Sequence, residues 1–260
     1  MFKIYSQGQA DKAKFWKSHW DTQDISARME AAKRNELISI FKKSLPVTGK
    51  VLEAGCGQGI FVNALNDLGY EMEGVDFDGK TVELVNAQFP TLKIKKGDVF
   101  QLEYPDNYFD GYISLGVIEH YENKWQEPLQ EAYRVLTDGG IIFVSVPYYN
   151  WIRRIYLPIF GSRKSDSNFY QYLFTKKEIL KAVKNSNFRI KSVEFYGKTK
   201  TLISLPIIGG TLRRKHSSLR KSESASQTGH KKSSQLLKMF LKFLPGSLFA
   251  HMIMVIGEKQ

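Results

Sequence analysis

Val51-Leu52-Glu53-Ala54-Gly55-Cys56-Gly57-Gln58-Gly59 joins a short apolar run to three glycines spaced two residues apart. Val51 and Leu52 have the character of a buried parallel strand, and apolar residues recur at helical spacing after Gly59. The glycines therefore belong to a strand-to-helix turn, where backbone N–H groups can approach a ligand and the helix N-terminus favours negative charge. This arrangement predicts a cofactor site.

The segments on either side of this turn alternate between strand and helix patterns, as expected of a doubly wound parallel sheet. Strands are expected at Lys50–Ala54, Glu71–Asp76, Leu92–Lys95, Asp110–Leu115, Ile141–Val146, Phe188–Tyr196 and Phe249–Gly257. Helices are expected at Ser26–Lys43, Ile60–Leu68, Lys80–Gln88, Trp125–Leu136 and Lys176–Asn185. Thr175 and Glu178 form a capping box for the last of these helices.

Composition restricts the class of protein. The chain has 260 residues, of which 42% are hydrophobic and 25% charged, as in ordinary globular proteins. Cys56 is the single cysteine, so neither an intrachain disulfide nor a cysteine zinc cluster can form. The N-terminal segment lacks an apolar core, and no run of 18 apolar residues occurs, so neither a secretory signal nor a transmembrane span is expected. We expect a cytoplasmic protein, or one attached peripherally to the inner face of a membrane.

Charge is distributed unevenly along the chain. Residues 1–150 contain 16 Lys and Arg against 21 Asp and Glu, whereas residues 151–260 contain 22 against 5, a net charge of +17. Such a basic region is expected to meet phospholipid headgroups, a phosphate-bearing substrate or nucleic acid. The alternative is a solvated basic face with no partner.

Further motifs follow the glycine turn in a fixed order. The turn has the form E-x-G-x-G-x-G, unlike the G-x-G-x-x-G of dinucleotide sites, and Asp76 ends the next strand about 20 residues on. Gly97-Asp98-Val99-Phe100, Phe109 to His120, and Leu136 to Gly140 complete the series. Together they resemble the motifs of class I S-adenosylmethionine-dependent methyltransferases, across roughly residues 50–147. The subgroup resembled is type 11, which is typified by the methyltransferases of ubiquinone and menaquinone biosynthesis.

The resemblance implies a fold and a cofactor. The fold would be α/β, with a Rossmann-like, doubly wound seven-stranded sheet, mostly parallel with an antiparallel last strand, and helices on both faces. The cofactor would be S-adenosylmethionine, leaving as S-adenosylhomocysteine, with no metal. The residues implied in binding are Glu53, Gly55, Cys56, Gly57, Gly59, Asp76, Phe77, Asp98, Val99, Leu115 and Gly116.

The resemblance also gives these residues roles. Glu53 would face the methionine amino group, Asp76 the ribose and Asp98 the adenine, while Phe77 would pack on the base. The alternative is that Asp76 and Asp98 only cap strand ends, and that Cys56 is only a small residue in a tight turn.

Catalysis would consist mainly of aligning an acceptor with the S–CH₃ bond. A base helps a hydroxyl acceptor, and His120 after the fourth strand is the candidate, with a structural hydrogen bond as the alternative. His19, Tyr121, Tyr148 and Tyr149 are weaker candidates for the base, since each could equally be a packing or rim residue. Substrate contacts are expected from Trp16, Tyr121, Tyr148 and Tyr149, with core packing as the alternative for Trp16.

Five parts of the chain are expected. They are an N-terminal helical cap (1–46), the cofactor-binding core (47–147), an aromatic and basic insertion (148–174), the completion of the sheet (175–199 and 246–260), and a basic amphipathic insertion, partly disordered (200–245).

The function expected is methylation of a small or lipophilic acceptor, such as a quinone precursor, a lipid or a lipid-linked saccharide. Residues 151–164 and 200–245 would contact an anionic membrane surface. The alternatives are an RNA methyltransferase, which is less favoured because no RNA-binding module is recognisable, and a non-catalytic cofactor-binding partner protein. The oligomeric state is not indicated.

Overall fold

A seven-stranded sheet forms the centre of the molecule in the computed structural model, which describes residues 1–6, 24–160, 168–198 and 245–260. The strand order is β4-β3-β2-β5-β6-β9-β8. Neighbouring pairs from β4 to β6 are parallel, whereas β9 is antiparallel to both β6 and β8. The expected fold class is therefore confirmed, including the antiparallel last strand. The strands are β2 (Lys50–Ala54), β3 (Glu71–Asp76), β4 (Lys93–Lys96), β5 (Phe109–Leu115), β6 (Leu136–Pro147), β8 (Phe188–Tyr196) and β9 (Met252–Lys259).

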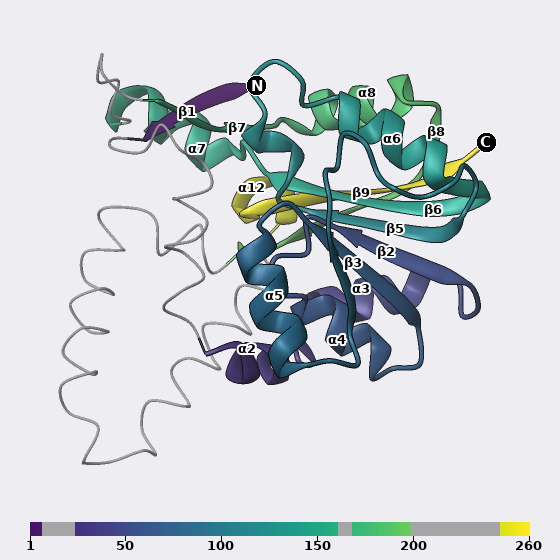
Figure 1. Cartoon of the computed structure of the whole chain (residues 1–260). Helices are drawn as coiled ribbons and strands as arrows, with labels where there is room; N and C mark the ends of the chain where they lie inside the picture. The colour runs from purple at the N-terminus through teal and green to yellow at the C-terminus, as the bar shows by residue number, and fades with distance from the viewer. Residues whose placement is uncertain (7–23, 161–167, 199–244) are drawn as a thin grey trace, which may run out of the picture.

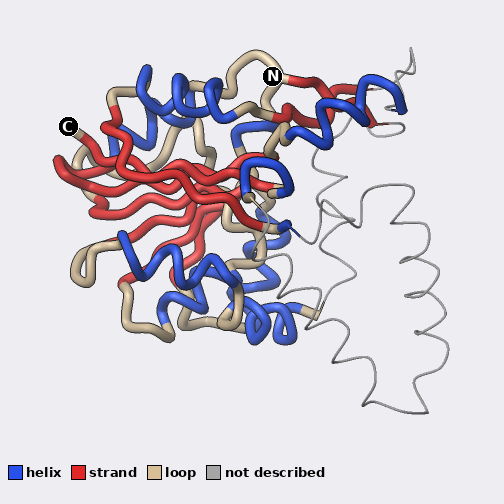
Figure 2. Tube along the Cα trace, turned by 180° about the vertical axis from the view of Figure 1, so that it is seen from behind, coloured by secondary structure: helices blue, strands red, loops and turns tan. Residues whose placement is uncertain are grey.

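Helices cover both faces of this sheet, which Figure 2 shows between two helical layers. One layer consists of α2 (Ile25–Ala32), α3 (Glu36–Ser44), α4 (Ile60–Asn66) and α5 (Gly79–Gln88). The other contains α6 (Glu127–Val135) and α8 (Lys176–Asn185). Each layer closes its own apolar cluster, with Phe41 and Phe143 in one and Leu129 and Phe109 in the other. The apolar run of each central strand is thus explained by burial on two faces.

The helix expected at Ser26–Lys43 is wrong in one respect, because the structure has two helices there. Helix α2 ends at Ala32, and Asn35 starts α3 by accepting a hydrogen bond from Leu37 N–H on its side chain. An asparagine in extended conformation is a strong N-cap, so it interrupts a pattern whose apolar spacing alone suggested continuity.

A second, two-stranded sheet was not predicted. Strand β1 (Phe2–Ser6) pairs antiparallel with β7 (Asn168–Leu173), so the expected N-terminal helical cap is wrong at its first residues. The Phe2 ring stacks on Tyr149 with 5.1 Å between centroids. The segment 148–174 also contains α7 (Trp151–Phe160), and Figure 1 shows α7, β1 and β7 together at one end of the main sheet. That end is where the parallel strands finish, because β9 starts there.

Other differences concern boundaries. The strand expected from Phe249 begins at Met252, after the short helix α12 (Gly246–Phe249), and α6 begins two residues later than expected. Strand β6 begins at Leu136, earlier than expected.

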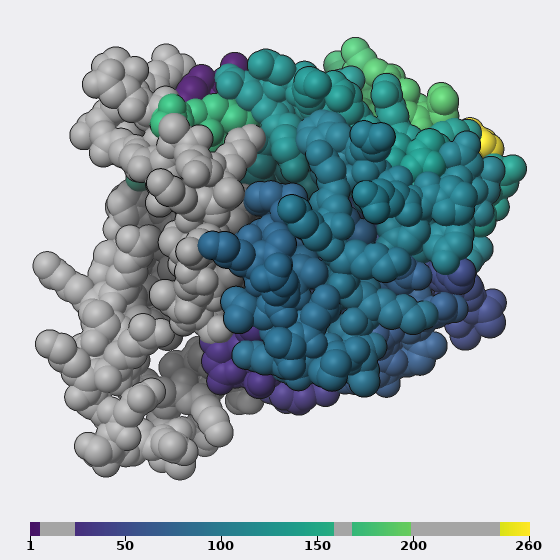
Figure 3. Space-filling model, viewed as in Figure 1, coloured from purple at the N-terminus to yellow at the C-terminus, as the bar shows by residue number. Residues whose placement is uncertain are grey.

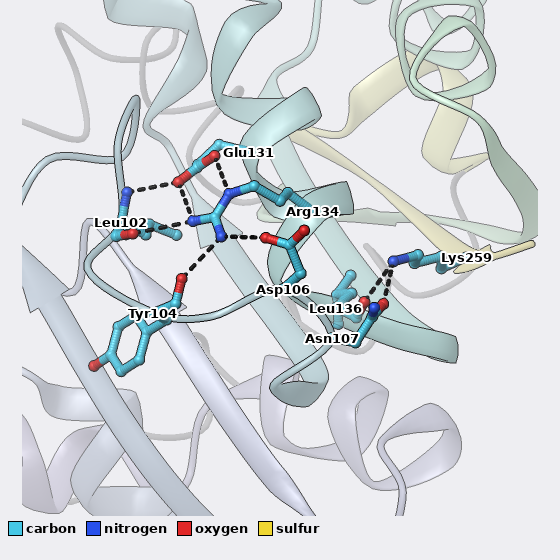
Figure 4. Close-up of polar contacts among 8 residues, drawn as sticks. All are labelled: Leu102, Tyr104, Asp106, Asn107, Glu131, Arg134, Leu136 and Lys259. Carbon is cyan, nitrogen blue, oxygen red and sulfur yellow. Dashed lines mark hydrogen bonds and ion pairs between the residues drawn. The ribbon is translucent and has the colours of Figure 1, made fainter.

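A polar network holds the opposite end of the sheet (Figure 4). Arg134 donates to Asp106 Oδ1 (2.7 Å), to the Leu102 and Tyr104 carbonyls and to Glu131, and thus fastens the 102–106 loop to α6. The buried Lys259 donates to the Leu136 carbonyl and to Asn107 Oδ1, both at 2.7 Å. These contacts stabilise the fold far from the carboxyl ends of the strands.

Several sequence-based expectations lie outside the described residues. Trp16, His19 and the insertion 200–245 fall there, apart from Pro245, as do residues 161–164. In the described part of the chain, no helix is long and apolar enough to cross a bilayer. In the space-filling view, residues from the middle of the chain form most of the visible described face (Figure 3).

Candidate cofactor and acceptor site

The glycine turn lies between β2 and α4, at the carboxyl end of the sheet. Gly55, Gly57 and Gly59 all have positive φ, at 77°, 52° and 65°. A methyl group on Gly55 would overlap Val117, and one on Gly59 would overlap Ile94. Glycine is thus required twice over, by backbone conformation and by the close approach of neighbouring side chains.

Four N–H groups of this turn are used within the protein, whereas the sequence led us to expect them to face a ligand. Gly55 and Cys56 donate to the Val75 carbonyl, Gly59 donates to the Cys56 carbonyl, and Gly57 donates to Asp76 Oδ2. A phosphate site needs such donors free. These four N–H groups are therefore not available to a phosphate.

Asp76 stands at the end of β3, beside the turn. Its Oδ2 accepts from Gly57 N–H (2.7 Å) and its Oδ1 accepts from Asp78 N–H (3.0 Å). Burial raises the pKa of this carboxyl, and backbone hydrogen bonds from Asp78, Gly57 and Phe77 oppose that rise. Each oxygen still has a lone pair for a further donor. The capping role left open by the sequence is therefore real, and it leaves room for a ligand hydroxyl.

Glu53 is buried in β2, with 3% of its surface exposed. Burial raises the pKa of Glu53 to about 8, against a hydrogen bond from the Val62 backbone. Its Oε2 has no hydrogen-bond partner among the described residues. Cys56 is also buried, and burial raises the pKa of its thiol, so it is a small packing residue of the turn.

The residues expected near the adenine differ in how far their side chains are exposed. Val99 is buried, whereas Asp98 is exposed and accepts Phe100 N–H on Oδ1 (3.0 Å). Phe77 is 42% exposed and follows directly after Asp76. Asp98 thus caps a turn, and Phe77 is available to a flat ring rather than committed to the core.

The end of β5 supplies the other side of the site. Gly116, with φ of 73°, follows Leu115 and donates its N–H to the Ser145 carbonyl of β6. The short 3₁₀ turn η1 (Ile118–His120) comes next. Glu119 in this turn is 2% exposed, burial raises its pKa to about 8, and its Oε2 has no hydrogen-bond partner in the described part of the chain.

His120 contacts β7. Its Nδ1 lies 2.9 Å from the Tyr170 carbonyl, so Nδ1 carries the hydrogen of the neutral ring. Its Nε2 lies 4.0 Å from Glu119 Oε1. Tyr170 also places its ring against the imidazole, with centroids 5.2 Å apart. The imidazole is held in one orientation at the carboxyl end of β5, and both predicted roles, base and structural donor, are compatible with it.

The tyrosines expected to contact substrate divide into two groups. Tyr121 packs edge-on against Phe100, and burial with nearby Asp98 and Asp76 raises its pKa to about 12. Tyr148 packs on Phe195, and Tyr149 stacks on Phe2. Tyr121 therefore borders the cofactor side, whereas the other two mainly hold β1 and β8 in place.

Some residues of the site were not identified from the sequence. Arg28 on α2 donates to Gln58 Oε1 in the glycine turn, and Glu119, Tyr170 and Tyr196 surround the end of β5. Glu119 was part of a quoted motif, but its burial is not visible in the sequence. In the described ranges, no group of three His, Cys, Asp or Glu side chains converges as metal ligands.

Known proteins share this arrangement. Residues 52–144 match the family described as "Methyltransferase domain". A probable S-adenosylmethionine-dependent methyltransferase of Mycolicibacterium smegmatis is 38% identical over 97 residues, which are 37% of each chain. A demethylmenaquinone methyltransferase of Lysinibacillus sphaericus is 25% identical over 153 residues, 53% of this chain and 64% of that protein.

Solved structures agree at the level of fold. A SAM-dependent methyltransferase from Archaeoglobus fulgidus superposes with a TM-score of 0.58 and 17% identity, over 96% of this chain and all of that one. The fold is thus the class I Rossmann-like fold of these structures. Residues 52–144 are similar to a methyltransferase domain, and the relatives matched there are probable S-adenosylmethionine-dependent methyltransferases. The chain spans only about a third of the length of the curated relatives it matches first.

Proposed function

We propose that this protein transfers a methyl group from S-adenosylmethionine to a small or lipophilic acceptor at an anionic membrane surface. The observation that carries the donor half is the pairing of the glycine turn with Asp76. The N–H groups of Gly55, Cys56, Gly57 and Gly59 are used internally and are not available to a phosphate, and the Asp76 carboxyl can accept further hydrogen bonds. The residues present therefore fit a nucleoside that has ribose hydroxyls and no phosphate.

Different residues of the chain would bind different parts of the cofactor. Asp76 would accept both ribose hydroxyls, Glu53 would bind the amino group, and Leu115 and Gly116 would line the methionine portion with backbone. Val99 and Phe77 would border the adenine, with Asp98 at its rim. When bound, the cofactor supplies a methyl group activated on sulfonium, so the protein needs only to align an acceptor and exclude water.

Calorimetric titration tests the donor half. S-adenosylmethionine and S-adenosylhomocysteine are expected to bind, and NAD⁺ is expected not to bind, because its pyrophosphate needs the N–H groups that the turn uses internally. Binding of NAD⁺ in preference to S-adenosylmethionine would contradict the proposal.

The acceptor half rests on α7. Trp151 is 58% exposed and Ile155 is 55% exposed, and the exposed Arg154 lies between them. Leu248 of α12, which contacts α7, adds another exposed apolar side chain. These elements lie at the carboxyl end of the parallel strands (Figure 1). An aromatic, an aliphatic and a cationic side chain together suit a membrane interface. The demethylmenaquinone methyltransferase among the relatives supports a lipophilic acceptor.

Sedimentation with vesicles tests the acceptor half. The protein is expected to bind vesicles of phosphatidylcholine with phosphatidylglycerol, and the double variant Trp151→Ala/Ile155→Ala is expected to lose that binding. Leu84→Ala is the matched control, since Leu84 is 51% exposed but belongs to α5. Indifference to the vesicles together with salt-sensitive RNA binding would replace the lipid acceptor by RNA. If the protein binds the vesicles, transfer of labelled methyl groups to a demethylated quinone within them would identify the acceptor chemistry.

A further inference from the structure

Two close contacts place the Glu119 carboxyl of η1 beside the glycine turn and the end of β5. Val117, two residues earlier, lies so near Gly55 that a side chain there would overlap it, so the turn packs directly on the glycine turn. Oε1 of Glu119 lies 3.4 Å from the position that a methyl group on Gly116 would occupy. The carboxyl is thus folded back over the end of β5, next to the residues proposed to line the methionine portion.

This carboxyl lacks the partners that a buried acid normally has. Its Oε2 accepts no hydrogen bond among the described residues, and the side chain is only 2% exposed. The backbone N–H of Glu119 itself donates to the carboxyl, but this single donor does not offset the cost of burying a charge without a cation, so the protonated form is favoured. Burial accordingly raises its pKa to about 8.

The surroundings of Glu119 offer little to offset a negative charge. His120 Nε2 lies 4.0 Å from Oε1, and it is the one basic nitrogen within that distance in the described part of the chain. Burial raises the pKa values of Tyr170 of β7, Tyr196 of β8 and Tyr121, and a negative charge on Glu119 raises them further. A cationic ligand would change this balance.

We propose that Glu119 is the counter-ion of the cofactor's sulfonium and the acceptor of the substrate's proton. The inference rests on the proposed function. Glu119 would release its proton when the positively charged cofactor binds, because a cation beside the carboxyl favours the ionised form. It would keep its proton with S-adenosylhomocysteine, which has the same amino and carboxylate groups but no sulfonium.

The same carboxylate then has a chemical use. Glu119 would take the proton of an acceptor O–H or N–H as the S–CH₃ bond breaks, the acceptor–CH₃ bond forms and the bonding pair remains on sulfur. The positive charge that held Glu119 ionised disappears in that step, so its affinity for a proton rises when the proton must be taken. His120, with Nδ1 held by the Tyr170 carbonyl, is positioned beside this carboxyl. The acceptors indicated are those that lose a proton on methylation.

Proton release on binding tests this inference without an acceptor. Calorimetric titrations at pH 7 in two buffers with different ionisation enthalpies give the number of protons released by each ligand. With a pKa of about 8, S-adenosylmethionine should release about 0.9 proton more than S-adenosylhomocysteine at pH 7, and about 0.1 more at pH 9. Glu119→Gln should abolish the difference at both pH values.

A matched variant at another buried glutamate shows whether the difference in proton release is specific to Glu119. Glu73 is 6% exposed, but its Oε2 accepts a 2.8 Å hydrogen bond from Tyr104. Glu73→Gln should retain the wild-type difference in proton release. Equal release by the two ligands in the wild type, or an unchanged difference in Glu119→Gln, would overturn the inference and leave the proposed function standing. Failure of both ligands to bind would overturn both.

Discussion

The two sides of the site are held together in different ways. On the β2–β3 side, a contiguous turn and the next strand end fix one another, and both Asp76 oxygens are occupied by backbone N–H groups 19 and 2 residues away. On the β5–β6 side, η1 is held by β7, whose own partner β1 comes from the start of the chain. The β2–β3 side is therefore fixed by contacts within one short part of the chain, whereas the β5–β6 side depends on pairing between distant segments. We expect that the β5–β6 side can be altered without loss of the β2–β3 side.

The largest effect is expected from Asp76→Ala on the β2–β3 side. The substitution removes the acceptor for two buried N–H groups and, by the proposed function, two hydrogen bonds to ribose. Loss of two charge-assisted hydrogen bonds corresponds to about 3 kcal/mol, or about 100-fold in the Kd for S-adenosylmethionine. Calorimetry measures this value, and Asp78→Asn, which keeps an oxygen for the N-cap of α5, should bind as the wild type does. Undiminished binding by Asp76→Ala would place the cofactor elsewhere.

Gly59→Ala should show that the β2–β3 side is fixed sterically. An alanine there would have unfavourable positive φ and would overlap Ile94, so the free energy of unfolding should fall by about 3 kcal/mol. Gly69→Ala is the control, because Gly69 has φ of 89° but no atom near an added methyl group, and about 1 kcal/mol is expected. Urea denaturation measures both variants. Equal losses would mean that backbone strain alone, and not packing of the turn, requires glycine at position 59.

A pH effect should reveal one buried acid on each side. Glu53 and Glu119 have a folded pKa of about 8, above the ordinary value of 4.5, so the folded state binds more protons between these values. The contribution of these two carboxyls to the free energy of unfolding is therefore fully present below about pH 4.5 and is lost as the pH rises to about 8. The loss is at most about 1.4 kcal/mol per pH unit for each carboxyl. Denaturation at a series of pH values should give a shallower decline for Glu53→Gln/Glu119→Gln. An identical decline in the double variant would mean that both acids are ionised in the folded protein.

The smallest effect is expected from Phe2→Ala on the β5–β6 side. Loss of the stacking on Tyr149 should cost about 1 kcal/mol of stability, and the affinity for S-adenosylmethionine should not change. Phe2→Tyr keeps the stacked ring and is the control for both measurements. Weaker cofactor binding in Phe2→Ala would show that the two sides are coupled after all.

The same division explains what the sequence could predict. The strands β2, β3, β5 and β6 are buried on both faces and separated by helices, so their apolar runs and glycines could be recognised locally. The Glu53, Gly55 and Asp76 positions followed from the same pattern.

Features that depend on contacts between distant segments were harder to predict from the sequence. Strand β1 is five residues long, partly exposed, and paired with residues near 170, so no local periodicity distinguishes it. Glu119 is buried in η1, which contacts β7, and nothing in its neighbours along the chain indicates that burial. Asn35 was visible as an N-cap residue, but the apolar spacing around it suggested a single helix.

The position of β9 has a consequence for how the protein is made. Strand β9 lies between β6 and β8, so β6 has an open edge from the time Pro147 leaves the ribosome until Met252 follows it. At the usual rate of synthesis this interval lasts on the order of 10 s. During it, a long apolar strand presents unpaired N–H and C=O groups, the condition under which nascent chains associate with one another or need a chaperone. The main sheet can close only after almost the whole of the described chain has been synthesised.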